Sequence, residues 1–129
     1  MEEVRAQLLE AMGFSRIAIG ILDKNLNMGI MKDPSVKAQH EGSCGDILML
    51  SLKIENRIIS DAKYEYIGCA GLQACASAMT ELIKGQEIEN AVKLDIDDII
   101  TYLERIPDTK IECAEIARDT LRKALKELT

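Results

Sequence analysis

The sequence predicts an α+β fold in which a small antiparallel sheet of two or three strands is covered by helices on one face. Apolar residues alternate with polar ones between residues 47 and 67, and after Gly68 the apolar spacing becomes helical. A block of strands followed by a block of helices is typical of α+β domains. A chain of 129 residues can bury its own core, so we expect one domain over residues 1–129.

The first 33 residues are predicted to form a helical region ahead of the sheet. Apolar residues four positions apart indicate a short amphipathic helix: Val4, Leu8 and Met12. Ser15 is a suitable N-cap for a second helix over residues 16–22. Pro34 marks the end of the region, because the residue before a proline is disfavoured in helical conformation. We expect residues 1–33 to be mobile or to depend on a partner.

A β-hairpin follows, and its apolar faces predict its register. Two runs of alternate residues are mostly apolar: Leu48, Leu50, Leu52 and Ile54, then Ile58, Ala62, Tyr64 and Tyr66. A three-residue turn over 55–57 pairs Leu50 with Ala62, whereas a shift of one residue opposes Leu50 to Lys63 and separates the apolar faces. We therefore expect the three-residue turn. Residues 34–42 are expected to add a third strand at the edge.

Three helices are predicted after the hairpin. The first begins after Gly68 and ends near Gly85, and its apolar stripe is Leu72, Ala76, Met79 and Ile83. Asp95 can cap a short second helix that ends before Pro107. The last helix runs from about Cys113 to Leu128, with these residues facing inward: Ile116, Thr120, Leu121, Ala124, Leu125 and Leu128.

Composition excludes several classes of function. The net charge is −6 and aromatic residues make up only 3%, which argues against a nucleic-acid partner. The one basic cluster alternates with acidic residues on the last helix and is typical of a solvated face: Arg118, Arg122, Lys123 and Lys126. The longest apolar run covers only residues 17–22, so we expect no membrane segment, no signal peptide and a cytoplasmic protein.

The four cysteines then favour metal or sulfur chemistry over disulfides, because the cytoplasm is reducing. In the predicted register Cys44 lies opposite Gly68, and Cys69 is the next residue. Opposed residues in a hairpin have Cβ atoms about 5 Å apart, so Cys44 and Cys69 are expected to meet. Asp46 points to the same side as Cys44, because positions i and i+2 of an extended segment share a side.

Cys69 and Cys113 each stand at the predicted start of a helix. Free N–H groups and the helix dipole stabilise a thiolate there, and thiolates bind soft metals. Cys75 follows Cys69 by six residues on one helix, about 240° around and about 9 Å along the axis, so we expect it in the core. The lone histidine, His40, is expected at the surface. Buried cysteines that form no site are the alternative interpretation.

Several familiar sites are missing from the sequence. The cysteines do not form the paired C-x-x-C units of a zinc ribbon, and no Gly-rich phosphate loop occurs. No nucleophile can be combined with His40 into a catalytic set. A thiolate-rich metal site is therefore the function that the residues themselves favour.

Several motifs together resemble the iron–sulfur cluster assembly scaffolds of the IscU and NifU N-terminal type over residues 24–128. They are Cys44-Gly45-Asp46, Tyr66-Ile67-Gly68-Cys69-Ala70, Ser77, Thr80-Glu81, Lys84-Gly85, and Lys110-Ile111-Glu112-Cys113. The resemblance implies a scaffold, not an enzyme, that receives sulfur from a cysteine desulfurase, accepts iron, assembles a [2Fe-2S] cluster and passes it to apo-proteins. An iron donor or a chaperone would be additional partners, and a homodimer is left open.

The resemblance also implies residue roles. Cys44, Cys69 and Cys113 would be cluster ligands and sulfur acceptors, and Asp46 the carboxylate that makes the cluster labile, since a hard oxygen binds soft iron less firmly. Zinc can occupy the same thiolates. Many members have histidine where this chain has Glu112, so the fourth ligand stays open between Asp46, Glu112 and an external group.

Two other departures concern partners. The segment that a chaperone reads in some members is here Ile106-Pro107-Asp108-Thr109-Lys110, and the N-terminal partner motif is reduced to Lys24-Asn25-Leu26-Asn27. The second hypothesis is a zinc-binding sulfur acceptor that works with a cysteine desulfurase and uses Cys113 as the acceptor thiol. A third is a structural zinc module, in which the metal supplies folding energy.

Overall fold

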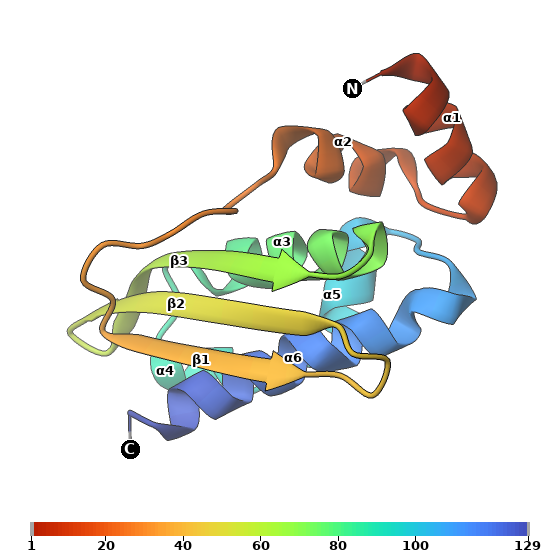
Figure 1. The fold of residues 1–129 in the computed structure, drawn as a ribbon. Helices are drawn as coiled ribbons and strands as arrows, with labels where there is room; N and C mark the ends of the chain where they lie inside the picture. The colour runs from red at the N-terminus through yellow and green to blue at the C-terminus, as the bar shows by residue number, and fades with distance from the viewer. Residues whose placement is uncertain (1, 129) are drawn as a thin grey trace.

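The computed structural model describes residues 2–128 as a three-stranded antiparallel sheet with helices against it. The strands lie in the order β1 (Val36–Glu41), β2 (Ile47–Glu55), β3 (Ile58–Ile67). The helices are α1 (Glu3–Met12), α2 (Arg16–Lys24), α3 (Ala70–Ile83), α4 (Ile88–Ala91), α5 (Ile96–Leu103) and α6 (Ile111–Lys126), with a 3-10 turn at Asp108–Lys110. Helices α3 and α6 cover one face of the sheet (Figure 1). The predicted fold class is therefore confirmed.

The predicted pairing of β2 with β3 is wrong by two residues. Leu50 pairs with Tyr64, and Leu52 pairs with Ala62. The turn contains two residues, Asn56 and Arg57, both in the left-handed region at φ 54° and 63°. A bulge then inserts one extra residue into β3, so the same apolar faces still meet although the partners differ.

The bulge also changes which isoleucine of the hairpin is buried. Lys53 pairs with Asp61 and Ile54 with Ile59, which leaves Ser60 as the extra residue. As a result Ile59 is fully buried, whereas Ile58, which was expected to face inward, is 38% exposed. The bulge restores the alternation that places Ala62 in the core.

Helix α3 is the centre of the core. It begins after Cys69 as expected and is buried on nearly every side, because the sheet, α2, α5 and α6 all pack against it. Lys84 caps its C-terminus, and Gly85 follows in the left-handed conformation at φ 82°, the usual role of glycine there. Asp95 caps α5, and the side chain of Asp98 completes a capping box.

Helix α6 begins two residues earlier than predicted, at Ile111. Cys113 therefore lies inside the first turn of the helix instead of at its start. Its inward face agrees with the prediction, with five residues buried: Ile116, Thr120, Leu121, Ala124 and Leu125.

The N-terminal region consists of two helices with different surroundings. Helix α2 packs into the core through Ala18 and Leu22, and Ser15 caps it by accepting a hydrogen bond from the N–H of Ala18 at 3.0 Å. In α1, which stands apart from the sheet in Figure 1, Leu9 is buried, while the predicted apolar stripe is more than half exposed: Val4, Leu8 and Met12. The mobility of residues 1–33 stays a prediction.

Hydrogen bonds fix α3 against the segment that follows α2. Gln73 Nε2 donates to Asn25 Oδ1 at 2.9 Å, and Asn27 Nδ2 donates to Thr80 Oγ1 at 3.0 Å. Polar groups buried in a core need such partners. The network therefore fixes the helix that begins immediately after Cys69.

Cys75 yields a prediction about alkaline stability. It is fully buried, and burial raises the pKa of its thiol from 9.0 to about 12. The unfolded thiol ionises near pH 9, so the free energy of unfolding should fall as pH rises from 9 to 12. Replacing Cys75 by Ala or Val should reduce this fall by on the order of 2 kcal/mol. Urea denaturation at several pH values under reducing conditions measures the free energy of unfolding. If this free energy falls equally with pH in the variants and the wild type, the buried Cys75 thiol is not the cause.

Candidate metal centre

Three of the four predicted site residues meet at one end of the molecule. The ligand atoms of Asp46, Cys69 and Cys113 all lie within 4.8 Å of one another. The Cys69 and Cys113 sulfurs are 3.8 Å apart, and the Cys69 sulfur is 3.9 Å from Asp46 Oδ2. Two sulfurs bound at 2.3 Å to one tetrahedral ion would lie about 3.8 Å apart. The two thiols therefore already have the spacing of a metal site.

Each of the three residues is placed by a different part of the fold. Asp46 directly precedes β2, Cys69 is the N-cap of α3, and Cys113 lies in the first turn of α6. The N-termini of α3 and α6 thus come together beside the loop between β1 and β2. Asp46 and Cys69 are half-buried and Cys113 is buried, so the group is partly shielded from water.

Two glycines allow this close approach. A Cβ on Gly68 would lie 2.9 Å from both Cγ and Oδ2 of Asp46, so only glycine leaves room for that carboxylate. A Cβ on Gly71 would lie 3.0 Å from the aliphatic chain of Lys110, which crosses the first turn of α3 there. The Asp46 carboxylate and the Lys110 side chain therefore occupy space that a side chain at position 68 or 71 would fill.

The electrostatics of the site favour a thiolate on Cys69. The hydrogen bond with the Cys113 thiol holds the pKa of Cys69 well below its usual range, against the opposing effect of burial. The backbone N–H groups of Leu72 and Gly71 and the charge of Lys110 lower it further. The pKa of Cys113 is raised, because that thiol donates the shared proton and is buried. Metal binding requires thiolates, and Cys69 is prepared to supply one.

Cys44 does not meet the other three residues in the way predicted. The ladder between β2 and β3 ends at Ile47 and Ile67, so the expected pairing of Cys44 with Gly68 does not form. The chain instead closes a tight turn, in which the N–H of Gly42 donates to the carbonyl of Asp46 at 2.8 Å. Cys44 lies in this turn with its side chain exposed. Its role as a ligand stays a prediction.

The remaining candidate residues lie outside the group. Glu112 is exposed and accepts a hydrogen bond from the Ser43 hydroxyl. His40 is half-buried in β1 opposite Leu48. Cys75 is a core residue, as expected. Lys110 was missed as part of the site, although its position just before the helix that carries Cys113 could have indicated it.

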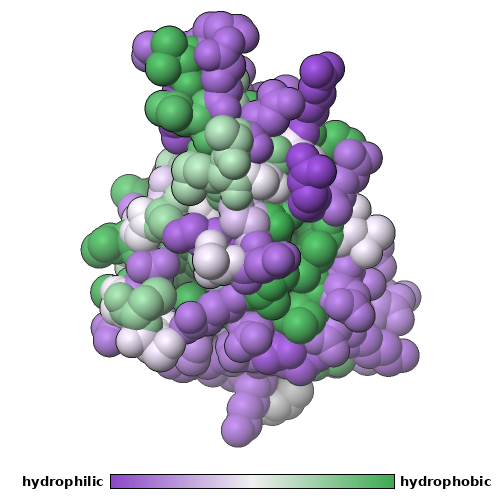
Figure 2. Space-filling view, turned by 90° about the vertical axis from the view of Figure 1, so that its right-hand side faces the viewer, coloured by the Kyte–Doolittle hydropathy of each residue, from purple (hydrophilic) through white to green (hydrophobic). Residues whose placement is uncertain are grey.

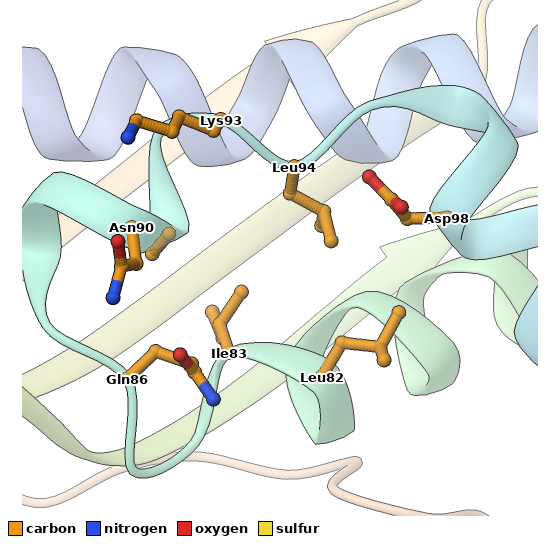
Figure 3. A pocket seen from close by; sticks show the side chains of 8 residues that line it. Leu82, Ile83, Gln86, Asn90, Lys93, Leu94 and Asp98 are labelled. Atoms are coloured by element: carbon orange, nitrogen blue, oxygen red, sulfur yellow. The ribbon is translucent and has the colours of Figure 1, made fainter.

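A separate pocket between the end of α3 and the α4–α5 segment does not compete as a metal site. Its volume is about 240 Å³. Figure 3 shows Leu82, Ile83 and Leu94 around the hollow, with polar side chains at its edge. No cysteine or histidine lines it among the described residues, whereas the group at Cys69 combines two sulfurs with a carboxylate.

Comparison with known sequences decides the family. The family model described as the NifU-like N-terminal domain matches residues 18–129. The chain belongs to this family. The NifU-like N-terminal family thus accounts for nearly the whole sequence beyond α1, including all three residues of the group, and it confirms the resemblance in the motifs.

Several similar proteins are named as iron–sulfur cluster assembly proteins, and another is named for nitrogen fixation. The iron–sulfur cluster assembly protein IscU of Plasmodium falciparum is 39% identical over 108 residues, covering 84% of this chain and 63% of that protein. The iron–sulfur cluster assembly scaffold protein IscU of Aquifex aeolicus is 33% identical over 104 residues, covering 78% and 66%. The nitrogen fixation protein NifU of Azotobacter chroococcum is 39% identical, covering 64% and 28%. This NifU-like chain therefore matches less than two thirds of each of these relatives.

Two solved structures share the fold of this NifU-like domain. A protein from Fervidobacterium islandicum, proposed to be an iron–sulfur cluster assembly scaffold for the SUF system, has a TM-score of 0.71 at 23% identity, covering 87% of this chain and 96% of that one. The N-terminal part of a NifU-like protein from Brucella abortus has a TM-score of 0.72 at 16% identity, covering 88% and 92%. At these identities the likeness shows the fold alone.

Gly68→Ala tests the packing at the centre of the site. The added methyl group should displace the Asp46 carboxylate from Cys69 and weaken Zn²⁺ binding about tenfold, the size typical of groups that orient ligands. Competition with a chromophoric chelator measures this affinity. Gly20→Ala in α2 is the matched control, because a Cβ there meets no atom within 4 Å. Equal affinities for the two variants would contradict the role of Gly68.

Proposed function

We propose that this protein is a scaffold on which a [2Fe-2S] cluster is assembled and from which it is transferred to apo-proteins. The meeting of the Cys69 and Cys113 thiols with the Asp46 carboxylate is the observation that carries the proposal. Thiolates are the usual protein ligands of iron–sulfur clusters. The protein carries the cluster as cargo and releases it whole.

The chemistry of the group suits temporary binding. Cys69 and Cys113 supply soft sulfur ligands, and Asp46 supplies a hard oxygen, which holds iron less firmly than a third thiolate would. Lys110 lies beside the Cys69 sulfur, and the negative charge of Cys69 raises the pKa of Lys110. Its positive charge would partly neutralise an anionic cluster.

The names of the relatives support assembly but not the finer steps. They describe iron–sulfur cluster assembly and scaffolding, and one from Drosophila melanogaster is named an assembly enzyme. A cysteine desulfurase as sulfur donor, iron as the second substrate, and apo-proteins as recipients are part of our proposal. We also propose that the protein acts without turning over a small substrate.

The surface around the site suits a protein partner. The end of the molecule that carries the β1–β2 loop and the N-termini of α3 and α6 faces the viewer in Figure 2, where hydrophobic and hydrophilic side chains lie close together. Ile67, at the end of β3, is 64% exposed there. We include Ile67, two positions before Cys69, in the proposed contact surface for a protein that delivers sulfur or receives a cluster.

A zinc-bound sulfur acceptor is the second candidate. The 3.8 Å between the Cys69 and Cys113 sulfurs fits a single tetrahedral ion as well as it fits a cluster. In this function Cys113 would accept sulfur from a desulfurase. The two functions differ in whether the chain holds iron together with sulfide.

The compartment belongs to the proposal as well. Within residues 2–128, none of the helices combines the length and the apolar character that a membrane crossing requires. A relative from Kluyveromyces lactis is named a mitochondrial protein. We retain the cytoplasm as the proposed location.

Anaerobic reconstitution with iron and sulfide tests the scaffold function. The wild type should become coloured, with about two irons and two sulfides per cluster. Asp46→Ala should retain the cluster several-fold longer against a chelator, because the weak oxygen ligand is removed. Asp97→Ala, an exposed carboxylate on α5, is the matched control and should behave as the wild type. A colourless protein with one zinc would exclude the scaffold and favour the sulfur acceptor.

A further inference from the structure

The loop that carries Cys44 is attached to helix α6 by a side chain next to the candidate centre. The Ser43 hydroxyl donates a hydrogen bond to Oε1 of Glu112. Ser43 directly precedes Cys44, and Glu112 directly precedes Cys113. One hydrogen bond therefore connects the immediate neighbours of two candidate ligands from distant parts of the sequence.

A second contact supports the same loop one turn further along α6. A Cβ on Gly42 would lie 2.4 Å from Cδ1 of Ile116, so the backbone of the loop rests directly on that side chain. Glu112 and Ile116 are four residues apart and share one face of the helix. The base of the loop is thus packed on α6, and Ser43 adds a polar attachment beside Cys44.

The loop itself has few other restraints. Backbone bonds close it at its base, from the N–H of Gly42 to the carbonyl of Asp46 at 2.8 Å and from the N–H of Gly45 to the carbonyl of Gly42 at 3.1 Å. Gly45 lies at φ 88°, a conformation that glycine adopts without strain. The side chains of Ser43 and Cys44 are both exposed. The orientation of Cys44 therefore depends strongly on the bond to Glu112.

We propose that Glu112 is a positioning residue that holds the Cys44 loop on α6 through Ser43, and that it is not itself a metal ligand. Its carboxylate is engaged by Ser43 and lies outside the group formed by Asp46, Cys69 and Cys113. The bond keeps Cys44 at the surface, and its release lets the loop turn Cys44 toward the other two thiols. A role for this movement of Cys44 in ligand binding rests on the proposed function. The hydrogen bond between Ser43 and Glu112 does not depend on that function.

Amide hydrogen exchange in the metal-free protein tests the attachment directly. Ser43→Ala and Glu112→Ala should each speed exchange of the Gly42 and Gly45 amides about fivefold, because either change removes the hydrogen bond. Glu112→Gln should stay close to the wild type, since its amide oxygen still accepts from Ser43. Glu115→Ala, an exposed carboxylate on the same helix, is the control.

Zn²⁺ affinity of the same variants separates a positioning residue from a ligand. We expect Glu112→Gln to bind Zn²⁺ within about threefold of the wild type. Ser43→Ala and Glu112→Ala should bind it as tightly as the wild type or up to about fivefold more tightly, because the Cys44 loop is already released. A ligand carboxylate would instead make both Glu112 variants lose affinity, by roughly tenfold or more, and leave Ser43→Ala unaffected.

The outcomes are distinct from those of the scaffold test. Unchanged exchange in Ser43→Ala, or equal effects of Glu112→Gln and Glu112→Ala on exchange, would overturn the proposal. Loss of Zn²⁺ affinity in the two Glu112 variants alone would overturn it as well. If the wild type fails to assemble a cluster, the scaffold function is wrong. The exchange experiment would still test the hydrogen bond between Ser43 and Glu112, because it uses the metal-free protein.

Discussion

The close approach of helices α3 and α6 at their N-termini is the constraint on which the site depends. It brings the Cys69 and Cys113 sulfurs to 3.8 Å although the residues are far apart in the chain. Both helices bury small residues, and alanine allows helix axes to come close. They are Ala74, Ala76 and Ala78 in α3, and Ala114, Ala117 and Ala124 in α6. The two thiols are therefore held by helices that pack against each other in the core.

The same arrangement explains the chemistry of the group. Two helix N-termini and Lys110 surround the sulfurs with donors and positive charge, which favour a thiolate on Cys69. Asp46 completes the group with a carboxylate, and Gly68 leaves the space that this carboxylate occupies. A group of two thiols and one carboxylate suits a thiophilic metal or cluster, and in the function we propose the carboxylate is the ligand that exchanges easily.

Local patterns in the sequence predicted the faces of the elements better than their exact partners. The alternation in the hairpin placed the apolar sides correctly. The two-residue turn and the bulge at Ser60 each changed the register by one residue, and together they left the faces unchanged. Cys69 at a helix start followed from local signals. Cys44 could not be placed in this way, because a tight turn and the contact of its neighbour with Glu112 direct the loop, and such a contact has no local signature.

X-ray absorption at the zinc edge shows whether Cys69 and Cys113 bind the same metal ion. One equivalent of Zn²⁺ would be bound to the wild type, Cys69→Ser, Cys113→Ser and Cys75→Ala. We expect Cys69→Ser and Cys113→Ser each to lose one sulfur ligand, while Cys75→Ala keeps the coordination of the wild type. An unchanged sulfur count in Cys69→Ser or Cys113→Ser, or a lost sulfur in Cys75→Ala, would show that Cys69 and Cys113 do not bind the metal together.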